Sequence, residues 1–367
     1  MTPSSGRGLL HLAAAVDQPG AYDAAAYTEP ARLAERGGLD FVTLRDGFAR
    51  PGPDALAVLA RVAPETRRIG LVPTVTTTHT EPFHVQAAVA TLDWVSRGRA
   101  GWRLDVSAGE REARLFGRRP AASAAALWRE AGEVADVAGR LWDSTAEDAG
   151  ARDPATGHRG GRHPVDFTGS TFSVRGPSTV PRPPQGHPVR VVDATEGPAR
   201  STAARYADVA LVRAAGCAQA AAVREELRSA AARFGRDPHT LRVLASLVVD
   251  LAGGEATAEP GWGSLLPDRG HGRRGATRRG AQGPPLYRGG PVDLAELIAA
   301  WHGQGAVDGF HLVPAEPHRD LERLVNGTVV LLQHRGLFRT FYPGSTLREH
   351  LGLARPASRY AAAGSGS

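Results

Sequence analysis

Residues 91–107 read TLDWVSRGRAGWRLDVS, and this stretch joins an apolar helix to a short strand. Apolar side chains at helical spacing lead into it, and Ser-Arg-Gly-Arg at 96–99 predicts the end of the helix. Residues 100–106 resemble a strand but include Arg103 and Asp105. Side chains two residues apart on a strand share a face, so both charges point the same way. Because charges are seldom buried without a partner, the sequence predicts that this strand opens into a polar site.

Short strands alternate with helices or long loops along the rest of the chain. This alternation is typical of a parallel α/β fold, and eight such units predict a closed (β/α)8 TIM barrel. We expect residues 1–355 to form one barrel domain, with insertions at about 145–188 and 253–290, and residues 356–367 to form a disordered tail. The expected strands lie at residues 8–15, 41–44, 69–75, 100–106, 189–192, 209–212, 241–249 and 309–313.

An open, doubly wound sheet is the structural alternative. It would carry a glycine-rich phosphate-binding turn after its first strand. Residues 16–19, which follow the first expected strand, read VDQP. The barrel is therefore the favoured fold.

The composition of the 367 residues limits the class of protein. Apolar residues make up 42% of the chain, and no apolar run approaches the roughly 20 residues that span a bilayer. We expect no signal peptide, no membrane association and a cytoplasmic location, and the single cysteine, Cys217, excludes an internal disulfide. The net charge is +6, with arginine as the only strongly basic residue type. The arginines are spread among acids rather than clustered, so we expect no nucleic-acid partner.

Polar side chains stand at or beyond the ends of several expected strands, where the sites of such barrels form. Asp46, Thr195 and Glu196 also have a structural interpretation as capping residues. His79 and His311 are candidates for proton transfer, or alternatively hydrogen-bonded wall residues. The full set of strand-end candidates is Asp46, Thr76, His79, Arg103, Asp105, Asp193, Thr195, Glu196 and His311.

No metal site is predicted, because the chain has neither a His-x-x-x-His pair on a helix nor a cysteine cluster. It also lacks a P-loop and a Gly-x-Ser-x-Gly nucleophile motif. His158 and His163 fall in a loose, polar segment and are expected to be solvated. The arginine pairs at 273–274 and 278–279 are spaced by glycine, which favours an irregular loop over a phosphate grip.

Several stretches together resemble the bacterial luciferase-like flavin-dependent monooxygenases, most closely the branch acting on nitrilotriacetate, alkanes and organosulfur compounds. They occur in the family's order and span nearly the whole chain. The resemblance independently implies the TIM barrel. The matching stretches are residues 33–37, 74–82, 91–93, 96–102, 141–144, 172–177, 183–186, 308–310, 335–339 and 346–353.

The resemblance implies a flavin-dependent oxidoreductase that uses oxygen and reduced FMN to oxygenate a small organic substrate. Some branches use the deazaflavin F420 instead, and a separate flavin reductase often supplies the reduced cofactor. Homodimers are common in the family. Asp46 matches the acid after the second strand, and Thr76 matches the small polar residue after the third. Trp128 stands where the family usually has a tyrosine near the flavin phosphate.

The expected flavin site departs from the family pattern. Arg103 replaces an asparagine that touches the flavin, and Asp105 follows it where an apolar residue is usual. After the fifth strand the family typically reads Gln-Ala-Gly-x-Ser, whereas residues 192–196 read VDATE. The carboxylate of Glu196 would repel a phosphate at close range.

Two interpretations follow from these departures. In the first, the protein is a flavin-dependent monooxygenase with an altered cradle, in which Arg103 compensates. In the second, the barrel has lost flavin and acts as a partner subunit, or uses its charged strand-end cluster for non-redox chemistry. The substrate and the choice between FMN and F420 are not encoded in any motif of the chain.

Overall fold

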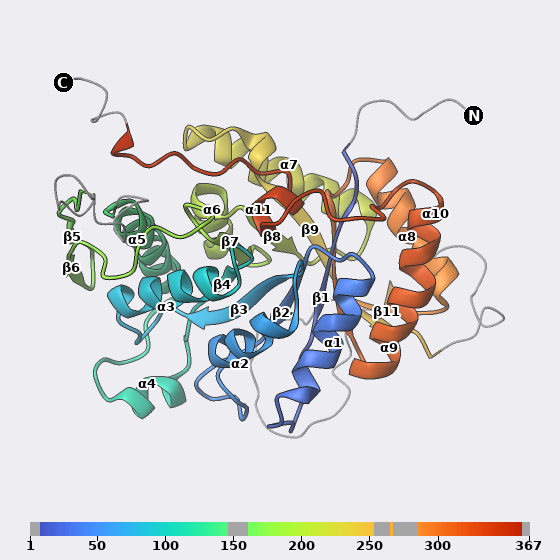
Figure 1. Cartoon of the computed structure of the whole chain (residues 1–367), viewed down its shortest axis with the longest axis horizontal. Coiled ribbons are helices and arrows are strands. Elements are labelled where there is room, and N and C mark those ends of the chain that lie inside the picture. The colour runs from blue at the N-terminus through green and yellow to red at the C-terminus, as the bar shows by residue number, and fades with distance from the viewer. Residues whose placement is uncertain (1–7, 146–160, 253–264, 267–284, 362–367) are drawn as a thin grey trace, which may run out of the picture.

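The computed structural model describes residues 8–145, 161–252, 265–266 and 285–361. Eight parallel strands close into a barrel, because β8 pairs with β9 as well as with β7. Figure 1 shows the helices around the outside of these strands. The barrel strands are β1 (His11–Ala15), β2 (Phe41–Leu44), β3 (Gly70–Thr76), β4 (Gly101–Asp105), β7 (Val189–Asp193), β8 (Val209–Val212), β9 (Arg242–Asp250) and β12 (Gly309–Pro314). The predicted (β/α)8 TIM barrel is confirmed.

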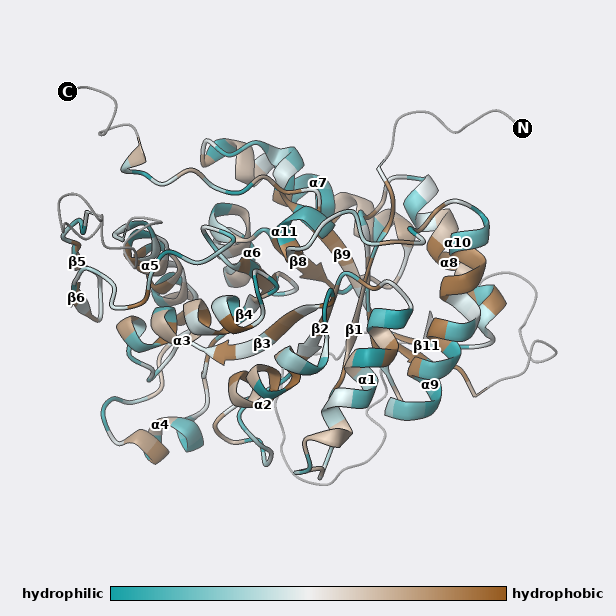
Figure 2. Ribbon diagram, in the orientation of Figure 1, coloured by the Kyte–Doolittle hydropathy of each residue, from teal (hydrophilic) through white to brown (hydrophobic). Residues whose placement is uncertain are grey.

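Helices follow the strands and bury one face against them. In Figure 2 the strands are mostly brown, and the helices carry hydrophilic residues on their outer faces. The helices of the barrel layer are α1 (Ala25–Arg36), α2 (Ala55–Val62), α3 (Pro82–Val95), α5 (Ala124–Asp143), α6 (Gly197–Tyr206), α7 (Cys217–Arg233), α8 (Pro291–Gly303), α9 (Pro317–Arg323) and α10 (Val330–His334). The last two are joined by the π-helical segment Leu324–Val329, where the sequence predicts one continuous helix.

Additional elements lie outside this repeating pattern. The first insertion contains the antiparallel hairpin β5 (Asp166–Thr168) and β6 (Ser173–Arg175), as its composition predicts. In the second, β10 (Leu265–Leu266) and β11 (Leu286–Arg288) extend the sheet beside β9. The sequence pattern does not predict four elements: β10, β11, α4 (Glu110–Phe116) and α11 (Leu347–His350). Two 3-10 turns, Ala63–Glu65 and Pro238–Thr240, precede β3 and β9.

The stretch at 91–107 folds as its sequence predicts. α3 ends at Val95, and Arg97 and Gly98 adopt left-handed backbone angles before β4 begins. Arg99 is buried, and its guanidinium donates to the carbonyl oxygens of four residues: Ala63, Thr66, Ile69 and Ser96. These bonds fix the helix-to-strand joint against the preceding βα unit.

α11 closes the amino-terminal end of the barrel. Its Leu347 side chain would lie 2.6 Å from a Cβ added at Gly70 and 3.3 Å from one added at Gly101, so a side chain would collide with Leu347 at the first glycine and crowd it at the second. Leu347 and Leu351 pack in one buried cluster with Phe41 from β2 and with other strand residues. The barrel interior is therefore filled where β2, β3 and β4 begin, and the carboxyl ends of the strands are left for a site.

The predicted tail lies only partly within the described residues. Pro356 accepts a hydrogen bond from Arg182 Nη2 at 2.7 Å. Tyr360 stacks on His163, with ring centroids 3.9 Å apart. Residues 356–361 thus contact the first insertion, and residues 362–367 lie outside the part of the chain that the structure describes.

Any side chain at Gly309 in the barrel wall is predicted to lower the stability of the fold. It pairs with His11 between β12 and β1, and an added Cβ would overlap the carbonyl oxygen of His11. We expect Gly309→Ala to lower the free energy of unfolding by about 1–3 kcal/mol, the usual range for overpacking. Urea denaturation followed by circular dichroism measures this loss. Gly303→Ala is the matched control, because nothing lies within 4 Å of its added Cβ; equal stability of the two variants would contradict the prediction.

Candidate active site

A pocket of about 620 Å³ lies at the carboxyl ends of five consecutive barrel strands. β2, β3, β4, β7 and β8 each contribute a side chain, or the residue that directly follows the strand. The first turns of α5 and α6 complete the wall through Trp128 and Ala199. The lining is Arg45, Asp46, Arg50, Thr74, Arg103, Asp105, Val106, Ala108, Ala124, Trp128, Asp193, Thr195, Glu196, Ala199 and Arg213.

Asp193, at the end of β7, organises the charges of this pocket. Its Oδ2 lies 2.9 Å from Nη2 of Arg213 and 3.7 Å from Nη2 of Arg103. Its Oδ1 accepts hydrogen bonds from the hydroxyl of Thr195 at 2.6 Å and from the backbone N–H of Thr195 at 3.2 Å. One carboxylate therefore holds two guanidiniums and the loop after β7.

The charge state of Asp193 follows from these contacts. Burial alone would raise the pKa of its carboxyl group. The guanidiniums of Arg103 and Arg213 and the hydrogen bonds from Thr195 outweigh burial and hold that pKa below its usual value. Asp193 is therefore ionised throughout the neutral range.

Two buried polar atoms of the pocket have no hydrogen-bond partner among the described residues. They are the hydroxyl oxygen of Thr74 on β3 and Nε of Arg103 on β4. These residues are register partners on adjacent strands. Because an unsatisfied buried polar group costs about 1–3 kcal/mol, a ligand with acceptor atoms at this place would be favoured.

The amino terminus of α6 opens onto the same pocket. Glu196 is its N-cap residue, but the side chain makes no capping hydrogen bond and is exposed. The first backbone N–H groups of a helix attract anions, and Ala199 in this turn lines the pocket. The turn can hold a phosphate, and Glu196 would weaken that binding.

The structure brings together six of the seven residues predicted to bind the cofactor: Asp46, Arg103, Asp105, Trp128, Thr195 and Glu196. Asp46 also has the capping role considered above, because its carboxylate accepts from the backbone N–H groups of Gly47 and Ala55. Thr76 is not in the pocket lining. It pairs with Asp105 at the end of β3, and Thr74, two residues earlier on the same strand, lines the pocket instead.

The two histidines predicted to transfer protons lie in different surroundings. His311 is buried in β12; its Nε2 is 2.8 Å from the hydroxyl of Thr43, and its Nδ1 is 3.0 Å from that of Ser246. Burial lowers its pKa to about 3, so the ring is neutral at physiological pH. His79 has a left-handed backbone and stacks on Phe116, and neither of its ring nitrogens has a hydrogen-bond partner among the described residues. Neither histidine is in the pocket lining. Burial lowers its pKa as well.

Sequence reasoning missed three arginines and one threonine of the pocket: Arg45, Arg50, Thr74 and Arg213. Arg45 and Arg213 directly follow β2 and β8, so the strand-end rule would have found both. Thr74 lies inside β3, where the type of residue gives no signal. The arginine pairs at 273–274 and 278–279, and His158, lie outside the described residues.

Among the described residues, no group of three or more His, Cys, Asp or Glu side chains is placed to hold a metal ion. None of the described helices is both long and apolar enough to cross a bilayer.

The sequence and the fold of this barrel are similar to those of known proteins. A family model described as luciferase-like monooxygenase matches residues 8–279. Nitrilotriacetate monooxygenase component A of Aminobacter aminovorans is 33% identical over 91% of each chain. N-acetyl-S-(2-succino)cysteine monooxygenase of Bacillus subtilis is 30% identical, again over 91% of each chain. Among solved structures, the EDTA monooxygenase of Chelativorans superposes with a TM-score of 0.81 at 22% identity, covering 95% of this chain and 99% of the other.

Removing the charge of Asp193 is expected to destabilise the protein. In Asp193→Asn, Arg103 and Arg213 would share a neutral partner in a partly buried site. We expect the free energy of unfolding to fall by about 2–4 kcal/mol, close to the range for breaking a buried pair. Glu226→Gln is the control, since its exposed pair with Arg200 should be worth at most about 1 kcal/mol. Urea denaturation compares them, and equal losses would contradict a central role for Asp193.

His311 predicts a loss of stability in acid. Its folded-state pKa of about 3 lies below the ordinary value of about 6.5, so between these pH values the unfolded chain binds the extra proton. The free energy of unfolding should therefore fall as pH drops from 6.5 towards 3, by up to about 1.4 kcal/mol per pH unit from this group. His311→Gln should remove that part of the slope. His334→Gln, at an exposed position, should leave the slope unchanged; an unaltered slope in His311→Gln would contradict the prediction.

Proposed function

The chain belongs to the luciferase-like monooxygenase family, and from that membership we propose that it holds reduced FMN in the strand-end pocket and oxygenates a small organic substrate there. Reduced flavin, when bound, activates dioxygen for transfer of one oxygen atom to the substrate. The observation that carries the proposal is the pair of unsatisfied buried polar atoms on Thr74 and Arg103 beside an uncapped helix turn.

The residues of the pocket fit a flavin mononucleotide in chemical type. Arg103 Nε and the hydroxyl of Thr74 supply hydrogen-bond donors within the barrel mouth, suited to the ring oxygens and nitrogens of a flavin. Trp128 offers an aromatic surface on α5. The first turn of α6 supplies backbone N–H groups for the phosphate.

In this proposal Arg103 binds the flavin through a guanidinium that is held in one orientation. Its charged Nη2 end lies near Asp193, which also holds Arg213, so its Nε is left as the donor that faces no protein acceptor. The guanidinium can therefore replace a neutral asparagine as a donor while its charge is balanced by a carboxylate of the protein.

His79 and His311 have different parts in the proposal. His311 is a neutral imidazole between two hydroxyl groups, Thr43 and Ser246, and can pass a proton along this chain without becoming charged. His79, on the loop after β3, has two buried ring nitrogens without a partner among the described residues but does not line the pocket, so a proton would reach it through an intervening group. Both assignments remain proposals.

We propose the reductase partner and the alternative cofactor from the relatives of the chain. The relative from Aminobacter aminovorans is component A of nitrilotriacetate monooxygenase, so we propose a separate reductase that supplies reduced FMN. F420 is the alternative cofactor, since an F420-dependent secondary alcohol dehydrogenase shares the fold with a TM-score of 0.64. A homodimer and a cytoplasmic location complete the proposal.

Glu196 provides the sharpest test of where the phosphate binds. We expect Glu196→Gln to bind FMN about 3–10-fold more tightly, because it removes a like charge worth about 1 kcal/mol near the phosphate. Riboflavin, which has no phosphate, should bind both proteins equally. Calorimetry and quenching of flavin fluorescence measure both ligands, with reduced FMN titrated under anaerobic conditions.

Glu316→Gln is the matched control, because Glu316 is likewise an exposed N-cap glutamate, at α9. It should change neither affinity. An equal gain for riboflavin and FMN in Glu196→Gln would contradict the phosphate assignment. Absence of saturable FMN and F420 binding to the wild-type protein at millimolar concentration would contradict the proposed function, and would favour the flavin-free partner subunit.

A further inference from the structure

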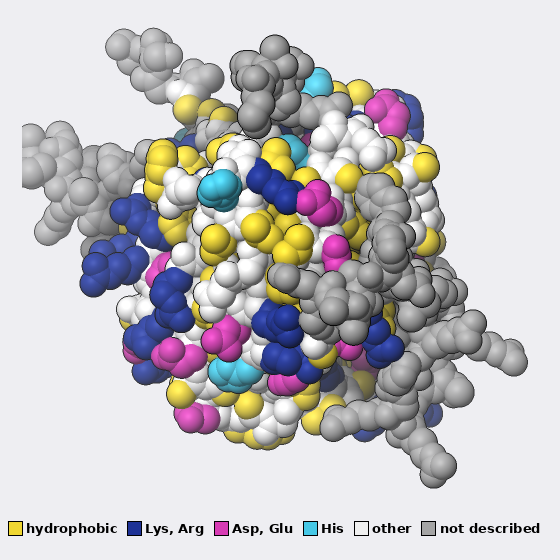
Figure 3. Space-filling view, turned by 90° about the vertical axis from the view of Figure 1, so that its right-hand side faces the viewer, with side chains coloured by type: hydrophobic (Ala, Val, Ile, Leu, Met, Phe, Trp, Pro, Cys, Tyr) yellow, Lys and Arg dark blue, Asp and Glu magenta, His cyan; other side chains and the backbone are white. Residues whose placement is uncertain are grey.

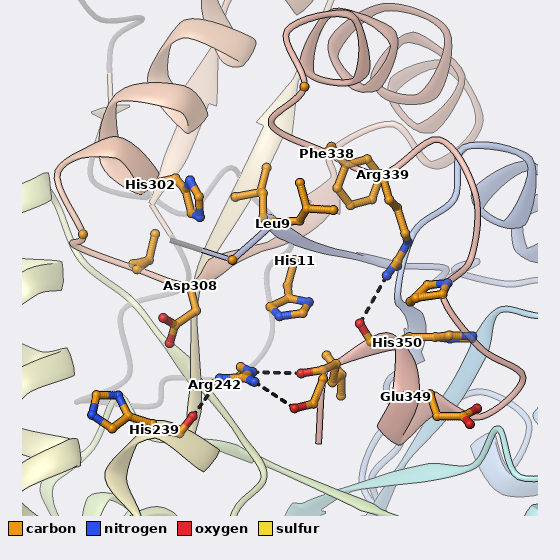
Figure 4. Close-up of a pocket in the computed structure, with 18 of the residues that line it drawn as sticks. Leu9, His11, His239, Arg242, His302, Asp308, Phe338, Arg339, Glu349 and His350 are labelled. Atoms are coloured by element: carbon orange, nitrogen blue, oxygen red, sulfur yellow. Dashed lines mark hydrogen bonds between the residues drawn. The ribbon is translucent and has the colours of Figure 1, made fainter. Parts of the chain in front are cut away.

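A second and larger cavity, of about 920 Å³, lies at the amino-terminal end of the barrel. It is bounded by residues just before β1, β9 and β12, by α7, and by the carboxyl-terminal segment from Phe338 to Gly352. Figure 4 shows Asp308, Arg242 and His239 on one side, Phe338 and Arg339 on the other, and His11 between them. None of its lining residues is shared with the pocket described above.

Positive charge exceeds negative charge on one wall of this cavity. Asp308 accepts from Nη2 of Arg224 at 2.8 Å and from Nη2 of Arg228 at 3.1 Å, and its Oδ2 also accepts the backbone N–H of Val243. One carboxylate thus faces two guanidiniums and is already saturated with donors. One positive charge remains uncompensated on α7.

Arg242 adds a second uncompensated charge to the same wall. Its guanidinium donates only to backbone carbonyls, those of His239, Leu351 and Gly352, and no carboxylate of the described residues pairs with it. Arg242 also lies close enough to Arg228 to depress the pKa of that guanidinium, after burial as the first cause. Asp308 is the one carboxylate of the described residues that pairs with any of these three arginines. Glu349 also lines the cavity, with its carboxylate held by the backbone N–H groups of Ser345 and Thr346, so one net positive charge remains to attract an anion.

Four buried polar atoms of the lining have no hydrogen-bond partner in the described part of the chain. These are Nε of Arg224, Nε of Arg228, Nδ1 of His350 and Nη2 of Arg339, the last of which forms an ion pair with Asp40. The His350 side chain is 3% exposed, so water cannot easily compensate it. The protein leaves these groups unsatisfied although satisfied alternatives would be more stable, which is typical of a binding site.

Part of the remaining wall is apolar. Leu9 and Phe341 are 55% and 76% exposed, although both are large and hydrophobic. They lie beside Phe338, which is buried. On the wider face around α8, α9 and α10, Figure 3 shows acidic and basic side chains interspersed, so the visible part of this face carries no patch of a single charge.

We propose that this cavity is a binding site for a small organic anion, with a carboxylate, sulfonate or phosphate group on Arg228 and Arg242 and an apolar body against Leu9 and Phe341. The volume is within the range of small-molecule sites, about 300–1,000 Å³. The site is separated from the strand-end pocket by the length of the barrel, so it binds a molecule other than the substrate under oxidation.

The aromatic sulfonate 8-anilinonaphthalene-1-sulfonate is a suitable probe, because it combines one fixed negative charge with an apolar body. Fluorescence and calorimetric titrations should show one saturable site in the wild-type chain. Arg228→Gln should weaken that binding about 10-fold, as expected for the loss of a charged hydrogen-bond donor. Phe341→Ser should weaken it about 5-fold by removing apolar contact area.

Matched controls separate the cavity from general effects of charge and hydrophobicity. Arg233→Gln makes the same change on an exposed turn of α7, and Phe234→Ser removes an exposed phenylalanine outside the cavity. Both should bind the probe as the wild type does.

Three results would overturn the proposal. The first is no saturable binding to the wild-type chain. The second is equal binding by wild type, Arg228→Gln and Phe341→Ser, with circular dichroism showing all three folded. The third is loss of binding in Arg103→Gln rather than in Arg228→Gln, which would place the probe at the strand-end pocket. None of these results depends on whether FMN binds.

Discussion

The barrel depends on aspartates that stand just before its strands and accept the N–H group of the second residue of a neighbouring strand. Asp40 accepts from Leu12 at 2.7 Å, Asp208 from Arg190 at 2.8 Å and Asp308 from Val243 at 2.8 Å. Each is also paired with arginine, and the pKa of each carboxyl group is held below its usual value against the effect of burial. Strand register and charge compensation are therefore achieved by the same side chains at the amino-terminal end, which fixes the geometry of the opposite end.

Asp193 uses the same pairing of carboxylate and guanidinium at the carboxyl end, with a different result. Asp208 is fully enclosed with Arg348 beneath α11, whereas Asp193 borders a pocket and leaves Nε of Arg103 without an acceptor. The amino-terminal pairs thus stabilise the fold, and the pair at the strand ends holds donors in a defined position. A site built on strand ends inherits the rigidity of the barrel, which is why one carboxylate suffices to orient two long side chains.

The sequence predicted what depends on local pattern. The alternation of all eight barrel strands with helices can be recognised in the sequence, and the strand-end rule placed Arg103, Asp105 and Glu196 in one pocket. The sequence pattern could not predict α11, which is a helix of four residues. Its stability comes from packing Leu347 against two glycines rather than from helix propensity. Nor could the pattern predict the second cavity, because its walls come from residues 8 to 352, and neither helical nor strand periodicity records such long-range proximity.

Arg103, Asp193 and Arg213 are best understood as one unit rather than as three departures from a family pattern. Arg103 alone would place a charge beside Arg213 in a partly buried wall, where like charges repel strongly. Asp193 alone would lose the two partners that outweigh its cost of burial. Together the three carry a single net positive charge, within a lining that has four arginines and four acidic residues. The charged strand ends therefore favour a retained polar site over simple decay, since decay would leave isolated charges instead of a mutually dependent set.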